Sequence, residues 1–259
     1  MTQELLYETR GDIGWVTFNR PRARNALTFA MYEGLAEICG RVGRTGEARA
    51  LVITGAGDKA FAAGTDIAQF QAFEGGEDGI AYERKMDVIL ETIERCPVPT
   101  IAAIVGYCTG GGAAIAAVCD LRIATANAQF GFPIARTLGN CLSMSNYARL
   151  AALVGPQRVK EMVFLAKLMD GPSALASGLV SELLPDPPAL LARAGELART
   201  VADHAPLTLR VTKEALRRLQ ARLGDDNIDD LIRLAYGSAD FREGMAAFLA
   251  KRAPKWSGT

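Results

Sequence analysis

The sequence lacks most of the features that mark nucleic-acid-binding, metal-binding, disulfide-rich or membrane proteins. Its 259 residues carry 29 basic and 29 acidic side chains, so no basic excess indicates a nucleic-acid partner. It has one histidine, and its five cysteines form no CxxC pair, which argues against a zinc site or a disulfide framework. No apolar run approaches the ~20 residues of a membrane span. Small molecules or other protein chains remain as the expected partners.

The N-terminal segment MTQELLYETR also lacks the basic stretch and apolar run of a secretory signal. Together with an odd number of cysteines, this favours reduced thiols in the cytoplasm. We therefore expect a cytoplasmic protein without a metal ion.

Apolar segments of strand length alternate with amphipathic helical patterns through the first half of the chain. This alternation indicates βαβ units and an α/β fold, and the chain reads as helical almost throughout after about residue 142. We expect one folding unit, with an α/β core over residues 1–195 and a helical region over residues 196–259. The polar segment 74–79 is predicted to be a flexible connection. Strands are predicted over residues 5–9, 13–18, 50–54, 100–105 and 120–124.

Two loops rich in small residues carry the clearest chemical signal. One is residues 61–67, and the other contains the triplet Gly110-Gly111-Gly112, which opens a helix. The first N–H groups of a helix have no internal partner, and the helix dipole adds positive charge there. Two such groups that converge on one point form an oxyanion hole. A Rossmann site or a P-loop is excluded, because neither GxGxxG nor Gly-Lys-Ser/Thr occurs.

Six segments, in order along nearly the whole chain, resemble motifs of the crotonase (enoyl-CoA hydratase/isomerase) superfamily. Each is a weak signal alone, whereas six at familiar spacing are a strong one. They are Asn19-Arg20-Pro21 with Asn25-Ala26-Leu27, residues 61–67, residues 106–112 with Cys119-Asp120, residues 128–131 with Pro133, residues 178–180, and residues 248–256.

The resemblance implies a crotonase-like spiral of repeated ββα units with a C-terminal helical region that mediates trimerisation. It implies an acyl-CoA thioester as the substrate and a homotrimer or dimer of trimers as the assembly. Coenzyme A would enter as part of the substrate, and no separate cofactor is implied.

The resemblance also implies a role for each matching residue. The backbone N–H groups of Thr65 and Gly111 would form the oxyanion hole, and the carbonyl of Ala63 would contact the adenine. Asp66 is interpreted as a helix N-cap, and Asp120 as a structural residue at the end of a buried strand. The expected substrate-binding residues are Ala23, Arg24, Ala26, Ala63, Gly64, Asp66, Ile67, Gly110, Ala114, Ile134 and Arg136. The candidates for coenzyme A phosphates are Arg22, Arg24, Lys251 and Arg252, the last two reaching a neighbouring subunit.

The chain departs from the family's hydratases at both positions where they carry a catalytic glutamate. Ala114 and Ile134 stand there, and neither side chain can carry a proton. Arg136, Cys108, Cys141 and Tyr107 are candidate replacements, and a structural or orienting role is favoured for each. The only histidine, His204, is distant in sequence from both loops.

We therefore expect an enzyme of the enoyl-CoA hydratase/isomerase family whose reaction passes through a thioester enolate. Decarboxylation, C–C cleavage and hydrolysis are alternatives to hydration. A non-catalytic acyl-CoA-binding subunit is an alternative of a different class.

Overall fold

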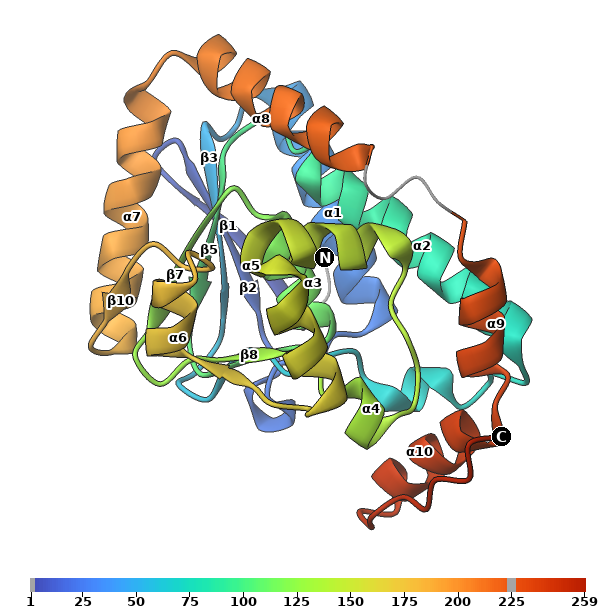
Figure 1. Ribbon diagram of the computed structural model, residues 1–259. Helices are drawn as coiled ribbons and strands as arrows, with labels where there is room; N and C mark the ends of the chain where they lie inside the picture. The colour runs from blue at the N-terminus through green and yellow to red at the C-terminus, as the bar shows by residue number, and fades with distance from the viewer. Residues whose placement is uncertain (1–2, 223–226) are drawn as a thin grey trace.

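The computed structural model describes residues 3–222 and 227–259, and its centre is a six-stranded sheet (Figure 1). The strand order is β1-β2-β3-β5-β7-β10; β1 is antiparallel to β2, and the other neighbours are parallel. These strands are β1 (Leu5–Arg10), β2 (Ile13–Phe18), β3 (Ala50–Gly55), β5 (Thr100–Ile104), β7 (Leu121–Thr125) and β10 (Leu183–Leu184).

A second sheet has four shorter strands in the order β4-β6-β8-β9. The pairs β4–β6 and β6–β8 are parallel, and β8–β9 is antiparallel. These strands are β4 (Ala60–Ala62), β6 (Tyr107–Thr109), β8 (Gln129–Gly131) and β9 (Met169–Asp170).

Helices lie on both faces of the large sheet and continue beyond it at the C-terminal end (Figure 1). The α-helices are α1 (Phe29–Thr45), α2 (Gly76–Glu94), α3 (Gly111–Val118), α4 (Ile134–Thr137), α5 (Met144–Phe164), α6 (Gly171–Ala176), α7 (Pro187–Asp203), α8 (Pro206–Ala221), α9 (Asp229–Tyr236) and α10 (Ala239–Leu249). Two 3₁₀ turns are η1 (Pro21–Ala23) and η2 (Ile67–Phe70).

The central strands β3 and β5 are buried on both faces of the large sheet, and their side chains point alternately to the two faces. In β3, Leu51 and Ile53 belong to the main core, which also contains buried residues of α1, α2, α3 and α5. Ala50 and Val52 point the other way, into a second core closed by α7. There Leu190, Ala194, Ala198 and Ala202 recur every four residues, which gives α7 one apolar stripe. Parallel strands with two apolar faces need this cover.

The predicted α/β class is confirmed, and the five predicted strands are present with end shifts of one residue. The short strands β4, β6 and β8 were not anticipated. The prediction of a flexible segment over 74–79 is wrong from Gly76 onward, where α2 begins. Asp78 accepts hydrogen bonds from the N–H groups of Glu74 and Gly75, which fixes the first turn of α2.

The C-terminal helices differ among themselves in how they attach. Tyr236 of α9 and Phe241 of α10 are buried in an aromatic cluster with Phe70. In contrast, α8 has no buried residue and exposes Leu207, Val211, Leu216 and Leu219. The division predicted at residue 195 falls inside α7. Within the described ranges, no helix is long and apolar enough to cross a membrane.

Candidate active site

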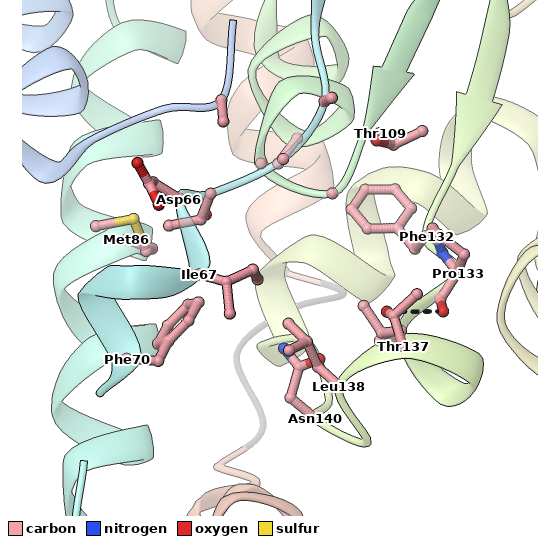
Figure 2. A pocket seen from close by; sticks show the side chains of 18 of the residues that line it. Asp66, Ile67, Phe70, Met86, Thr109, Phe132, Pro133, Thr137, Leu138 and Asn140 are labelled. Carbon is pink, nitrogen blue, oxygen red and sulfur yellow. Dashed lines mark hydrogen bonds between the residues drawn. The ribbon is translucent and has the colours of Figure 1, made fainter. Parts of the chain in front are cut away.

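A cavity of about 510 Å³ lies where the two small-residue loops meet helices α2, α3, α4 and α10 (Figure 2). Thr65, Gly110 and Gly111 line one part of it, and Phe132, Ile134 and Leu138 line another. The predicted residues on its wall are Ala23, Arg24, Ala26, Ala63, Gly64, Thr65, Asp66, Ile67, Gly110, Gly111, Ala114 and Ile134. The structure thus brings together segments that are more than 100 residues apart.

The two loops touch because they leave the same edge of the second sheet. Strands β4 and β6 are parallel neighbours, so the segments after Ala62 and Thr109 emerge side by side. A Cβ placed on Gly110 would lie 3.3 Å from the Cα of Gly64, and one on Gly111 would lie 3.1 Å from Thr65 Oγ1. This contact brings the backbone of Thr65 close to that of Gly111.

The N–H groups of Thr65 and Gly111 donate no hydrogen bond to any group among the described residues. Gly111 is the first residue of α3, where a free N–H is the rule. Two unpaired donors at the wall of a cavity, one of them at a helix N-terminus, form a suitable site for a negatively charged oxygen.

Each glycine of the triplet is required for a different reason. Gly110 has φ 51° and ψ −123°, a conformation that side chains disfavour. A Cβ on Gly111 would lie 1.7 Å from the hydroxyl oxygen of Tyr32, and one on Gly112 would lie 2.3 Å from the carbonyl oxygen of Ala62. The triplet therefore allows α3 to start against β4 and beneath Tyr32.

Three hydroxyl groups form a chain beside the proposed oxyanion site. Tyr32 Oη lies 2.8 Å from Thr65 Oγ1, which lies 3.1 Å from Tyr82 Oη. Burial raises the pKa of both tyrosines above their usual value, so both phenols are neutral. The sequence interpretation gave the Thr65 side chain no role, whereas here it joins α1 to α2.

Comparison with known proteins decides the family. The enoyl-CoA hydratase/isomerase model matches residues 8–259. The chain belongs to the enoyl-CoA hydratase/isomerase family. It is 32% identical over 256 residues to short-chain-enoyl-CoA hydratase of Clostridium acetobutylicum, covering 96% of this chain and 95% of that protein. It is 36% identical over 270 residues to (E)-benzylidenesuccinyl-CoA hydratase of Thauera aromatica, with 97% and 98% covered.

The fold agrees with solved structures of the same family. A methylmalonyl-CoA decarboxylase in complex with 2-nitronate-propionyl-CoA superposes with a TM-score of 0.89 at 28% identity, with 100% of both chains covered. The predicted crotonase-type α/β fold with C-terminal helices is therefore confirmed. The similarity to this family of acyl-CoA enzymes extends over residues 8–259.

The two positions where family hydratases are expected to carry glutamates lie on the cavity wall. Ala114 of α3 is 6% exposed and Ile134 of α4 is 7% exposed. Asp66, a carboxylate on the wall, is engaged elsewhere: it accepts a hydrogen bond from Ala68 N at 3.2 Å and pairs with Arg20 at 2.9 Å. The interpretation of Asp66 as an N-cap is confirmed.

A second carboxyl group on the wall, Glu83 of α2, was missed by the sequence interpretation. Its side chain is 4% exposed and accepts hydrogen bonds from Tyr236 Oη at 2.5 Å and Ser143 N at 3.1 Å. Burial raises its pKa to about 8, because loss of hydration and the nearby Asp87 outweigh these hydrogen bonds. Its helical spacing could have indicated this burial. Glu83 is three residues before Met86 and seven before Leu90, so it lies on the same buried face of α2.

Other predicted residues lie away from the cavity. Arg22, Arg136, Lys251 and Arg252 are exposed and do not belong to its wall, and Arg252 pairs with Glu243 at 2.6 Å. Arg24 does line the wall, with its guanidinium 5.2 Å from the ring centre of Tyr107.

The two candidate nucleophiles, Cys108 and Cys141, are poorly suited to attack a thioester. Burial raises the pKa of Cys108 well above its usual value and that of Cys141 to about 12, so both remain thiols. Asp120 accepts hydrogen bonds from Thr100 and Lys213, which agrees with a structural role.

Proposed function

We propose that this protein binds an acyl-CoA thioester and stabilises its enolate without the two-glutamate acid–base pair of the hydratases. The observation that carries the proposal is the pair of unpaired N–H groups, Thr65 and Gly111, on a cavity wall where Ala114 and Ile134 replace proton carriers. Its relatives named as hydratases support the substrate class, not the reaction.

The two N–H groups would bind the thioester oxygen, which gains negative charge as the enolate forms. A preorganised donor of this kind is typically worth ~2.7–4 kcal/mol of transition-state stabilisation. The start of α3 adds the positive end of a helix dipole. Stabilisation of the enolate oxygen by this wall requires backbone atoms only, so it does not depend on the two glutamates.

Decarboxylation is a second candidate, favoured by the likeness to methylmalonyl-CoA decarboxylase. In that reaction the electrons of the C–C bond to the carboxylate move into the thioester to form the enolate, and CO₂ leaves. A proton then adds to the α-carbon, and water can supply it. The step needs an oxyanion hole and no strong base, which suits Ala114 and Ile134. C–C cleavage, hydrolysis and a binding-only role remain alternatives.

Coenzyme A would lie along the wall that contains Ala23, Arg24 and Ala63. Arg24 is the cation best placed for its phosphates, because its guanidinium lines the cavity beside Tyr107. Arg22, and Lys251 or Arg252 from a neighbouring subunit, stay proposed phosphate contacts. A homotrimer or dimer of trimers is proposed for the assembly, supported by the exposed apolar side chains of α8.

Two assays with the purified protein test the function. Crotonyl-CoA is followed by loss of its enoyl absorbance, and methylmalonyl-CoA by release of CO₂. We expect no hydration, and CO₂ release if decarboxylation is the reaction. Clear hydration of crotonyl-CoA would overturn the proposed absence of acid–base chemistry. Calorimetric titration with both thioesters measures binding, and failure to bind either one would overturn the substrate class.

A further inference from the structure

Three polar side chains from three separate elements line an otherwise apolar part of the cavity. They are Glu83 of α2, Asn140 of the segment between α4 and α5, and Asn146 of α5. Their neighbours on the wall are Met86, Leu90, Leu138 and Leu142. Polar groups in apolar surroundings are costly unless they are paired, so their partners are informative.

Part of this polar set has no hydrogen-bond partner in residues 3–222 and 227–259. Asn140 donates through Nδ2 to Tyr236 Oη at 3.2 Å, while its Oδ1 is shielded from solvent and has no partner among the described residues. Asn146 is 5% exposed, and its carboxamide makes no hydrogen bond with the described part of the chain. The Asn146 carboxamide is on the cavity wall, so a bound group that pairs with it would gain affinity. Asn140 Oδ1 is shielded, so a bound group reaches it only after a rotation of that side chain.

Asn140 lies away from the thioester end of the cavity, whereas Glu83 follows Tyr82, whose hydroxyl contacts Thr65. Figure 2 shows Asn140 beside Leu138, across the cavity from Thr109, which precedes the glycine triplet. The position of Glu83 is fixed from two sides, by Tyr236 of α9 and by the backbone of Ser143. A group that reaches Asn140 from the thioester therefore belongs to the acyl chain.

We propose that Glu83, Asn140 and Asn146 form a polar subsite that binds an uncharged, oxygen-bearing group on the acyl chain, such as a hydroxyl or carbonyl. This inference rests on the proposed function, because it assumes that an acyl-CoA occupies the cavity. It goes beyond that function by stating which acyl groups are preferred.

The charges around the subsite select an uncharged group. Arg24 is the one cation among the described residues of the wall, and it lies beside Tyr107, in the segment between β2 and α1. A carboxylate at the subsite would therefore face the carboxyl of Glu83 without a counter-charge. A hydroxyl both donates and accepts, so it suits a carboxyl group and two carboxamides.

A purely structural role in joining helices explains Glu83 and Asn140 but not Asn146. The hydrogen bond between Glu83 and Tyr236 joins α2 to α9, and Asn140 adds to it. Asn146 takes no part in this network, although its side chain is buried on the wall.

The test compares matched ligands by isothermal titration calorimetry. The pairs are 4-hydroxybutyryl-CoA with pentanoyl-CoA, and 3-hydroxybutyryl-CoA with 3-methylbutyryl-CoA, in which a hydroxyl replaces a methyl group. We expect the wild-type protein to bind the hydroxylated member of at least one pair about tenfold more tightly. Asn146→Leu and Glu83→Gln are expected to reduce that ratio, and Asn146→Leu to bring it to one or below.

The matched control is Gln157→Leu, which replaces an exposed carboxamide on the same helix and should leave the ratio unchanged. Equal or weaker binding of the hydroxylated member in both wild-type pairs would overturn the subsite and leave the proposed function standing. Failure of all four ligands to bind would instead overturn the proposed function. The wild-type ratio decides between these outcomes even if a variant does not fold.

Discussion

The two walls of the cavity are built in different ways. The wall formed by residues 63–66 and 109–111 presents backbone N–H groups, and its side chains mainly permit close approach. The second wall is the part that presents the side chains of Glu83, Asn140 and Asn146, and helices α2, α5 and α9 hold these residues. The first wall is suited to a feature that all thioesters share, and the second to a feature that distinguishes one acyl group from another. Under the two proposals, enolate stabilisation and acyl selectivity thus depend on different groups of the cavity wall.

The largest effect should follow from Gly111→Ala, which tests the backbone wall. The added Cβ would lie 1.7 Å from Tyr32 Oη, so the N-terminus of α3 must shift. We expect the preference for a nitronate thioester, which mimics the enolate, over the corresponding acyl-CoA to fall ~10²–10³-fold. Calorimetric titration of both ligands measures it.

Gly40→Ala in α1 is the control for that experiment, because a Cβ there meets nothing closer than 3.8 Å. An unchanged nitronate preference in Gly111→Ala would mean that this N–H group does not bind the oxyanion.

A smaller effect should follow from Glu83→Gln, which tests the side-chain wall through pH. The pKa of Glu83 rises from 4.5 to about 8 on folding, so the folded state binds the extra proton between these values. Wild-type stability should therefore fall as pH rises from about 4.5 to 8, by at most about 1.4 kcal/mol per pH unit from this group. Glu83→Gln should lack this component, and urea unfolding at pH 5, 6.5 and 8 measures the difference.

Asp87 and Arg149 contribute to the same region, and both remain in the variant. The comparison with wild type therefore isolates Glu83. Parallel stability curves for the two proteins would show that Glu83 does not hold its proton.

The smallest effect should follow from Thr65→Val, which tests whether the backbone wall depends on a side chain. Removing Oγ1 leaves the hydroxyls of Tyr32 and Tyr82 without this partner, at a cost of ~1–3 kcal/mol in unfolding free energy. The N–H group of residue 65 is retained, so we expect nitronate preference to change little. Thr65→Ser should restore stability, and a large loss of nitronate preference in Thr65→Val would show that the two walls are not independent.

The contrast between backbone and side-chain function also explains which features could be predicted from the sequence. Backbone function needs glycine at particular positions, as at Gly110 and Gly111, and these positions form a local pattern that resembles the family's. The five main strands were predictable because each is a segment of five or six residues with several apolar or β-branched side chains, and β3 and β5 are almost wholly apolar. The short strands β4, β6 and β8 were not, since three residues carry too little periodicity.

Side-chain function leaves no such local pattern. Glu83 and its partner Tyr236 are 153 residues apart, and only the packing of α9 on α2 brings them together. A glutamate in an amphipathic helix is ordinarily exposed. Its burial depends on Gly79, where any Cβ would lie 2.3 Å from the Tyr236 ring, and this contact cannot be read from the segment itself.

The contact between Gly79 and Tyr236 makes the position of Glu83 depend on a distant part of the chain. The ring that holds Glu83 is supplied by α9, near the C-terminal end of the chain and far from the glycine loops. Under the proposed subsite, inherited changes in α9 alter the accepted acyl group while the enolate machinery stays intact. A chain with the same glycine loops and a different α9 would then prefer a different acyl group.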